Sequence, residues 1–304
     1  MNLKAQVERV PEGSVTRFAP SPTGYLHLGH VLNMLYVWGI ARACNGSVVS
    51  RMEDHDRGRY RPEHEKAILE DMEWLGFIPD RGLRAADALK PSKYRQSDCD
   101  AEYLAVLEEL WKSGLVYGCD CTRKQIKELQ PEVLDELRYP GLCRDRDHSF
   151  DAFTVRFRTP ESREVVFEDL RMGRRVQCPE AQCGDFSLRD RHGNWTYQFC
   201  CVCDDIRQGV NLIIRGEDIF GSTGRQIILN EVLGGQPIQY FHHGLLHDES
   251  GRKLSKRQFS ESIDQMRAEG ASAADIRGRA AFAGGLTDSF SPLSLDEALG
   301  LFGG

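Results

Sequence analysis

Two short segments carry the residues best suited to chemistry on phosphates. His27 and His30 are three positions apart, with Gly29 between them, and they follow a turn-forming stretch at residues 20–24. On a helix this spacing brings both imidazoles to the same side, and a glycine lets a ligand approach the backbone closely. A strand, a tight turn and a helix start would also expose backbone N–H groups, which bind anions. The alternative is a pair of histidines that only cap a helix.

The second segment, Lys253-Leu-Ser-Lys256, supplies positive charge and follows a turn-rich stretch at residues 247–251. Attack of a carboxylate on the α-phosphate of ATP builds negative charge on the phosphorus centre and on the leaving pyrophosphate, and cations placed there stabilise it. Taken alone, such a cluster is usually a solvated basic loop. Together the two segments predict adenylation of a carboxylate, with Lys256 as the main contact. The predicted ATP site is His27, Gly29, His30, Ser255 and Lys256, and the catalytic candidates are His27, His30, Lys253 and Lys256.

The elements that must position these residues alternate between strands and helices. The expected strands cover residues 14–19, 48–53 and 210–214. The expected helices cover about 28–40, 62–75, 101–113 and 222–233. Such alternation predicts a doubly wound α/β domain, in which ligands bind at the carboxyl ends of the strands. Glu53 and Arg215 both follow a strand in this way.

The middle of the chain carries a candidate metal site. Cys119 and Cys121 are separated by one residue, and Cys143 follows later as the end of a Tyr-x3-Cys stretch. Three thiolates can occupy three corners of the tetrahedron that zinc prefers. From chemistry alone, the candidates for the fourth ligand are Tyr139, His148 and Asp145. The plain alternative is a set of small buried cysteines.

The bulk composition limits the class of protein and its location. The chain has 304 residues, of which 40% are apolar and 28% charged, as in an ordinary globular protein. No stretch approaches the roughly eighteen apolar residues of a membrane helix, and no signal pattern is present, so we expect a cytoplasmic protein with no membrane association. Its ten cysteines are then expected as thiols or metal ligands. A net charge of −7 gives no overall attraction to RNA, so an RNA-binding surface would have to be local. The candidates for it are Arg171, Arg174 and Arg175.

Five motifs occur along the chain in an order that resembles a known family. They are Arg17-Phe-Ala-Pro-Ser-Pro-Thr-Gly24, Arg51-Met-Glu-Asp-His-Asp56, Tyr197-Gln198 with Asp204-Asp205, Ile214-Arg-Gly-Glu-Asp218 and Lys253-Leu-Ser-Lys256. The order and types resemble the glutamyl-tRNA synthetases, and more closely their truncated relatives, the glutamyl-Q tRNA(Asp) synthetases, over almost the whole chain. The resemblance implies activation of L-glutamate with Mg-ATP to glutamyl-adenylate. It also implies transfer of glutamate to the queuosine base of tRNA(Asp).

The resemblance further implies roles for individual residues. The glutamate site would consist of Arg17, Ala19, Ser21, Glu53, Tyr197 and Arg215. Glu53 would hold the substrate ammonium, while Arg17 and Arg215 suit carboxylates, because a guanidinium binds one in bidentate fashion. The truncated relatives bind zinc through Cys-x-Cys and a later Tyr-x3-Cys. This nominates Tyr139 as the fourth ligand of one structural zinc ion, beside Cys119, Cys121 and Cys143.

The implied domain organisation is a Rossmann-type class I catalytic domain over residues 1–258, interrupted by a zinc-containing insert at about 100–192. A short helical region at 259–304 would contact the RNA stem, with helices expected at 260–269, 271–283 and 293–301. Because only about fifty residues follow the lysine segment, we expect no anticodon-binding domain. That expectation favours the truncated branch, and we expect a monomer.

Three other interpretations compete with this one. His30 and the ending Lys-Leu-Ser-Lys-Arg257 resemble full-length enzymes, so a glutamyl-tRNA synthetase that charges the acceptor end of tRNA(Glu) is the alternative. A ligase that passes glutamyl-adenylate to a small amine fits less well with an intact metal insert. A non-catalytic relative that only binds glutamate or RNA is disfavoured, because both histidines and both lysines are present.

Overall fold

Parallel strands form the centre of the fold. The computed structural model describes residues 2–129, 136–146, 148–150, 153–246 and 261–303. One parallel sheet has the order β1 (Val15–Phe18), β2 (Ser47–Ser50) and β3 (Arg81–Gly82). The last three residues of both β1 and β2 are buried, so these strands have little solvent-exposed face. Burial on both faces is the usual situation of parallel strands in α/β proteins.

A second sheet begins on the other side of β1. Its order is β9 (Leu212–Gly216), β10 (Gln239–His243), β6 (Val165–Asp169) and β7 (Gly173–Gln177). β9 lies beside β1, and the N–H of Asn211 donates to the carbonyl of Val15 at 3.1 Å. β10 is parallel to both of its neighbours, and β7 pairs with β6 in the antiparallel sense. The chain therefore leaves β1 toward β2 and β3 and returns on the opposite side at β9. Open α/β sheets bind ligands at such a switch point.

The helix α2 (Leu28–Ala43) is buried along most of its length. Residues 31–41 are all buried except Asn33, because strands and the C-terminal helices pack around it. A helix that is apolar on all sides belongs inside the protein. At Gly39 a Cβ would overlap the ring of Phe302, so glycine allows the C-terminal segment to approach the helix. The first turn of this helix therefore stands on a rigid base.

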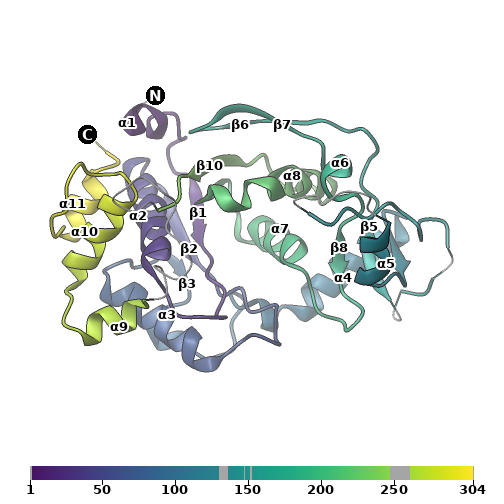
Figure 1. The fold of residues 1–304 in the computed structure, drawn as a ribbon, viewed down its shortest axis with the longest axis horizontal. Coiled ribbons are helices and arrows are strands. Elements are labelled where there is room, and N and C mark those ends of the chain that lie inside the picture. The colour runs from purple at the N-terminus through teal and green to yellow at the C-terminus, as the bar shows by residue number, and fades with distance from the viewer. Residues whose placement is uncertain (1, 130–135, 147, 151–152, 247–260, 304) are drawn as a thin grey trace.

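The C-terminal helices and an antiparallel sheet lie at opposite ends of the molecule (Figure 1). The C-terminal helices are α9 (Ile263–Ala268), α10 (Ala273–Ala283) and α11 (Leu295–Gly300). They pack on α2 and on α3 (Pro62–Trp74). The opposite end holds α4 (Asp100–Lys112), β4 (Val116–Cys119), α5 (Arg123–Glu128), β5 (Thr154–Phe157) and β8 (Ser187–Arg189). β4, β5 and β8 form the antiparallel sheet there.

The remaining elements connect these parts. The helices are α1 (Leu3–Val7), α6 (Pro179–Cys183), α7 (Tyr197–Gln208) and α8 (Thr223–Val232), and the 3-10 helices are Ala85–Asp87, Gln96–Asp98 and Glu217–Ser222. α7 and α8 pack together beside the central strands (Figure 1). In the described part of the chain, no helix combines the length and the apolar character needed to cross a bilayer.

Most of the elements predicted from the sequence are present. The expected helices are confirmed as α2, α3, α4, α8, α9, α10 and α11, and the expected strands as β1, β2 and β9. β9 begins and ends two residues later than predicted. The hairpin of β6 and β7, the antiparallel sheet and α7 were not predicted. β6 and β7 fall within residues 100–192, where the insert was expected, and yet they pair with the central strands.

Candidate active site

A pocket of about 550 Å³ opens where β1 and β9 end. It is lined by all the predicted ATP-site and glutamate-site residues that the structure describes, namely Arg17, Ala19, Ser21, His27, Gly29, His30, Glu53, Tyr197 and Arg215. The other predicted residues, Lys253, Ser255 and Lys256, lie outside the described residues. The structure thus gathers into one cavity side chains that are up to two hundred residues apart in the sequence.

The two histidines of the first segment cap α2 and hold each other in place. His27 is the N-cap, and its Nδ1 accepts a hydrogen bond from the N–H of Gly29 at 3.1 Å. The Nδ1 of His30 accepts from the N–H of His27, also at 3.1 Å. A neutral imidazole whose Nδ1 accepts must carry its proton on Nε2. Capping, which was the alternative to ligand binding, therefore sets both rings as Nε2–H donors.

Burial keeps both of these rings neutral. It lowers the pKa of His27, and burial together with the neighbouring His27 lowers the pKa of His30 to about 3. The ring centroids are 3.9 Å apart, so a second positive charge there would be repelled. At neutral pH the pair therefore offers hydrogen-bond donors rather than cations.

The structure gives a different reason for a glycine at position 29 from the one expected from the sequence. We predicted a glycine that clears space for a ligand. A Cβ at this position would lie 2.9 Å from Cε1 and 3.0 Å from Nδ1 of His27. The residue lines the pocket, but the nearest atoms that a side chain would meet belong to the His27 ring. Gly29 is thus required by the histidine cap itself.

One wall of the pocket carries Arg17 and Glu53, and a network of paired charges outside the lining holds these two side chains. The fully buried Arg51 donates from Nη2 to Oε1 of Glu53 at 2.9 Å and from Nη1 to Oδ1 of Asp205 at 2.5 Å. Arg17 places Nε 3.4 Å from the same oxygen of Asp205. Asp204 pairs with Arg207 at 2.7 Å. Burial acts to lower the pKa of Arg51, but the nearby carboxylates raise it well above its usual value. Three arginines thus balance three carboxylates.

Another wall of the pocket holds one arginine in a different way. Arg215 is 3% exposed, and its Nε donates to Nε2 of His242 at 3.0 Å. Its Nη1 donates to Oε1 of Gln226 at 2.7 Å, and its Nη2 to Oγ1 of Thr223 at 2.9 Å. None of these partners is a carboxylate, and no ion pair of Arg215 occurs among the described residues. A buried cation without a counter-ion in the protein is suited to receive an anionic ligand.

Tyr197, at the start of α7, also lines the pocket. Burial raises the pKa of Tyr197, so the side chain offers a neutral hydroxyl. Ala19 and Ser21 lie in the stretch that leads from β1 to α2 and line the same cavity. The buried charged groups that the pocket offers to a ligand are therefore two guanidinium groups, from Arg17 and Arg215, and the carboxylate of Glu53, with the Tyr197 hydroxyl beside them.

Some residues of this region were not predicted from the sequence. Asn33 and His243 line the pocket, with Nδ2 and Nε2 only 3.0 Å apart. Asn33 follows His30 by three residues, and this helical spacing is the signal that could have found it. His243 carries no such signal, because the pairing of β10 with β9 places it opposite Gly216. His242, which holds Arg215, was missed for the same reason. Gln226 lies on α8, and its contact with Arg215 depends on tertiary packing that no local pattern shows.

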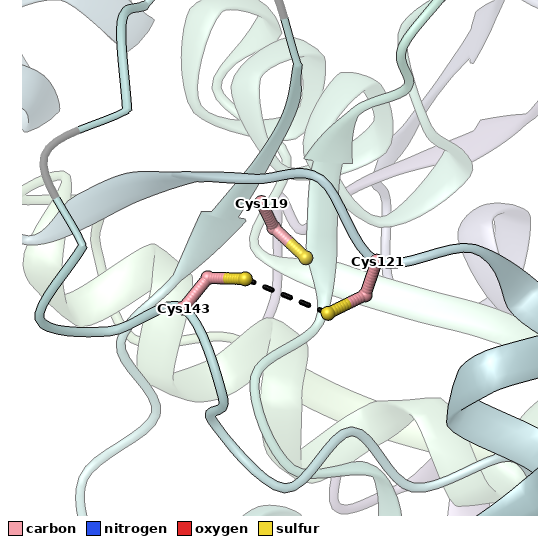
Figure 2. Close-up of side chains that lie close together, drawn as sticks. All are labelled: Cys119, Cys121 and Cys143. Atoms are coloured by element: carbon pink, nitrogen blue, oxygen red, sulfur yellow. Dashed lines mark hydrogen bonds between the residues drawn. The ribbon is translucent and has the colours of Figure 1, made fainter.

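The cysteine cluster lies in the antiparallel end of the molecule (Figure 2). The Sγ atoms of Cys119, Cys121 and Cys143 all lie within 4.8 Å of one another, and those of Cys121 and Cys143 are 3.5 Å apart. Thiolates that share a tetrahedral zinc ion with bonds of about 2.3 Å are separated by about 3.8 Å. The arrangement of the three sulfurs therefore fits a zinc ion.

Tyr139 is placed among these three sulfurs. Its Oη lies 3.2 Å from Sγ of Cys119 and 3.7 Å from Sγ of Cys121, and it accepts from the N–H of Cys143 at 3.0 Å. His148 instead lies near Asp120, with Nε2 3.5 Å from Oδ2, and these two share only Cys143 with the cluster. The contacts thus favour Tyr139 over His148 as the fourth donor.

The three arginines considered for an RNA-binding surface do not act as one group. Arg171 donates to the carbonyl of His242 and pairs with Glu217, so its guanidinium is engaged inside the protein. Arg174 and Arg175 are exposed on the edge strand β7. Only these two remain as candidates for an RNA contact.

Comparisons with known proteins agree with this geometry. Residues 14–278 match the model of the family described as tRNA synthetases class I (E and Q), catalytic domain. The chain is 37% identical over 296 residues to a glutamyl-Q tRNA(Asp) synthetase of Nitratidesulfovibrio vulgaris, which covers 94% of this chain and 90% of that relative. It is 39% identical over 263 residues to glutamate–tRNA ligase 2 of Halorhodospira halophila, which covers 84% of this chain and 53% of the ligase.

A solved structure shows the same fold. It is a glutamate tRNA ligase from Elizabethkingia meningosepticum in complex with its amino acid, with a TM-score of 0.78 and 26% identity. The match covers 95% of this chain, which spans 64% of that structure.

Proposed function

The chain belongs to the class I tRNA synthetases (E and Q), with their Rossmann-like α/β catalytic domain, and from this premise we propose that it is a glutamyl-Q tRNA(Asp) synthetase. It would activate L-glutamate with ATP and transfer the glutamyl group to the queuosine base of tRNA(Asp). The relative from N. vulgaris carries this name and is matched over 90% of its length. The ligase from H. halophila, matched over 53% of its length, supports charging of tRNA(Glu) as the alternative.

The observation that carries the proposal is the arrangement of charges in the pocket. L-Glutamate has two carboxylates and one ammonium group. The pocket has two buried guanidinium groups, from Arg17 and Arg215, and one buried carboxylate, from Glu53. The other charged residues of its lining, Asp56, Arg59 and Asp218, are more exposed. Both described hydrogen bonds to Glu53 from Arg51 end at Oε1, which leaves Oε2 for the ammonium. Since Arg215 has no carboxylate partner among the described residues, we infer that it binds one carboxylate of the substrate.

The first chemical step would join glutamate to the α-phosphate of ATP. The α-carboxylate attacks the phosphorus atom, and the bond to pyrophosphate breaks. The carboxylate is already ionised, so this step needs no general base. His27 and His30 would donate from Nε2 to phosphate oxygens, on which negative charge grows. Mg²⁺ would accompany the phosphates of ATP.

The second step would transfer the acyl group. A hydroxyl of the queuosine base attacks the carbonyl carbon of glutamyl-adenylate, and AMP leaves. The phosphate of the departing AMP can accept the proton of the hydroxyl, so we assign no protein side chain to this proton.

Lys253, Ser255 and Lys256 lie outside the described residues, so their roles rest on the sequence. We propose that Lys256, assisted by Lys253, stabilises the charge on the phosphates. Replacing Lys256 with alanine should slow adenylation by about 100-fold or more, the scale of losing one transition-state contact. An unchanged rate of ATP–pyrophosphate exchange in this variant would remove Lys256 from that role.

We further propose that Cys119, Cys121, Tyr139 and Cys143 hold one structural zinc ion. The sulfur separations and the position of the Tyr139 hydroxyl support this donor set. Metal analysis of the purified protein should give about one zinc per chain, and Cys143→Ser should lower this content. Cys178→Ser, which changes a cysteine outside the cluster, is the control. Equal zinc content in wild type and Cys143→Ser would contradict the assignment.

ATP–pyrophosphate exchange with glutamate, with and without tRNA, tests the proposed function. We expect exchange without tRNA. Labelled glutamate should then be transferred to tRNA(Asp) that carries queuosine, and not to tRNA(Asp) that lacks it. Exchange that requires tRNA(Glu), together with transfer to that tRNA, would support the alternative. No exchange under any of these conditions would contradict both functions.

A further inference from the structure

We propose that His242, held by Asp169, is a positioning residue that fixes the guanidinium of Arg215 for a substrate carboxylate. The inference rests on the proposed function, because it takes Arg215 as a carboxylate-binding residue. His242 lies on β10 directly opposite Arg215 on β9. His242 and Asp169 are both fully buried, and His242 does not line the pocket.

The hydrogen bonds determine which nitrogen of His242 carries the proton. An arginine can only donate, so Nε2 of His242 accepts from Nε of Arg215 at 3.0 Å. The proton is then on Nδ1, which donates to Oδ2 of Asp169 at 2.7 Å. Burial and the nearby Arg215 lower the pKa of His242 against the opposing effect of Asp169, which agrees with a neutral ring. The order of the chain is therefore carboxylate, neutral imidazole, guanidinium.

Asp169 is itself held so that it can only accept. Its Oδ1 accepts from the backbone N–H groups of Arg171 at 3.0 Å and Met172 at 2.8 Å. Its Oδ2 also accepts from the backbone N–H of His242 at 3.1 Å. These donors, and the bond to the imidazole, keep the pKa of Asp169 below its usual value despite burial, which acts to raise it. The β6–β7 turn and β10 thus fix the carboxylate, and the carboxylate fixes the ring.

The same bonds leave two donors of Arg215 for a ligand. Its guanidinium has five N–H groups. His242 takes the one on Nε, Gln226 takes one on Nη1 and Thr223 takes one on Nη2. One N–H therefore remains on each terminal nitrogen, and two such donors match the two oxygens of a carboxylate.

A histidine suits this position better than a carboxylate would. A carboxylate in contact with Arg215 would neutralise the charge that attracts the substrate. The imidazole instead transmits the orientation set by Asp169 and keeps the negative charge one ring away, where its attraction for the guanidinium is weaker. Arg215 is thereby held in one orientation while its charge remains available to the ligand.

The test compares the KM values for glutamate and for ATP in ATP–pyrophosphate exchange. His242→Leu removes the acceptor and should raise the KM for glutamate about tenfold or more, the scale of one hydrogen bond to a charged group. The KM for ATP should change less than about twofold. His242→Gln places a carboxamide oxygen where Nε2 accepts and should recover most of the loss. His64→Gln, which changes a histidine outside the pocket, should leave both constants unchanged.

Asp169→Asn gives a second test should His242→Leu fail to fold. Its Oδ1 can keep the bonds from the backbone N–H groups of Arg171 and Met172, whereas the bond from the backbone N–H of His242 to Oδ2 is lost. The amide instead donates to Nδ1 of His242 and shifts the proton to Nε2. That proton would oppose the Nε–H of Arg215, as in other sites where an amide imposes the wrong tautomer. We expect the same selective rise in the KM for glutamate.

Three results would overturn the inference. They are equal changes in both KM values, a change in melting temperature with unchanged KM values, and a His242→Gln variant no better than His242→Leu. If the wild type shows no glutamate-dependent exchange, the proposed function fails instead, and the two failures are thereby distinguished.

Discussion

The two walls of the pocket hold their arginines in opposite ways. On the paired wall, Arg17 and Glu53 line the pocket, and Arg51, Asp204 and Asp205 lie outside its lining. Each guanidinium of this group has a carboxylate within 4 Å. On the other wall, Arg215 is held by a histidine, a glutamine and a threonine. The charges of the paired wall are therefore balanced within the protein before a ligand binds, whereas Arg215 has no anionic partner among the described residues. A buried charge without a counter-ion destabilises the folded state, so the structure favours a ligand that supplies the anion.

The comparison predicts first that the paired wall is essential for folding. Arg51→Met leaves the carboxylates of Glu53 and Asp205 buried without their main partner. We expect the free energy of unfolding to fall by about 3–5 kcal/mol, as is usual when one partner of a buried ion pair is removed. Urea denaturation of the ligand-free protein measures this change.

A surface ion pair provides the matched control for Arg51→Met. Arg42 pairs with Asp80 at 3.1 Å, and both side chains are partly exposed. Arg42→Met should therefore lower the free energy of unfolding by at most about 1 kcal/mol. A loss for Arg51→Met as small as that for Arg42→Met would show that the paired wall is not held by its charges.

Arg215→Met should weaken glutamate binding strongly without lowering the stability of the ligand-free protein, which is the reverse of the stability loss expected for Arg51→Met. We expect the dissociation constant for glutamate to rise about 30-fold or more, because two charge-assisted hydrogen bonds are lost. The free energy of unfolding without ligand should stay equal or increase, because an uncompensated charge is removed. Calorimetric titration with glutamate and urea denaturation measure the two effects.

Arg215→Lys sharpens this second test. It keeps the charge but not the planar fork of donors, so it should not restore the affinity for glutamate. If either variant bound glutamate as tightly as the wild type, Arg215 would not be the carboxylate-binding residue. If Arg215→Met were instead strongly destabilised, the contrast between the two walls would be wrong.

Asp71 does not line the pocket, and as a buried acidic residue it can be compared with the buried cation of Arg215. Asp71 on α3 is buried, and burial followed by the nearby Asp264 raises its pKa to about 7. A raised pKa in the folded state stabilises the protein at low pH, and this contribution is lost as the pH rises from about 4 to 7. Asp71→Asn should therefore gain stability relative to the wild type over that range, by at most about 1.4 kcal/mol for each pH unit.

Urea denaturation of Asp71→Asn and wild type at pH 5 and pH 8 tests this effect. Glu63→Gln, which changes an exposed residue of the same helix that does not act on the pKa of Asp71, is the control and should show little pH-dependent difference. A constant difference between Asp71→Asn and the wild type at both pH values would mean that the carboxyl is ionised in the folded protein.

Sequence motifs pointed to several pocket-lining residues where the signal is local. Arg17 lies in β1, Glu53 follows β2 and His27 precedes α2, and the pattern of each element is visible in a few neighbouring residues. β9 was predicted to end at Ile214, and in the structure it continues through Arg215 to Gly216. Arg215 can lie in this buried strand because His242, Gln226 and Thr223 accept the hydrogen bonds of its guanidinium.

Residues that act through strand pairing could not be predicted in this way. Asp169 and His242 are 73 positions apart, and their contact depends on the pairing of β6 with β10. The β6–β7 hairpin itself was missed, because β7 is mostly exposed and carries no alternation of apolar and polar residues. The three cysteines of the proposed metal site were nominated by their type and spacing, while the choice of Tyr139 needed the resemblance to a family.

The cap of α2 has a consequence for how a nucleotide would bind. The hydrogen bonds that begin this helix are the same ones that orient His27 and His30. The two donors are therefore preorganised before any ligand arrives, and binding requires little loss of side-chain entropy from either ring. Because the helix behind them is buried, the rings cannot follow a misplaced phosphate without unwinding the first turn. Local folding thus acts as a selection step for the ligand.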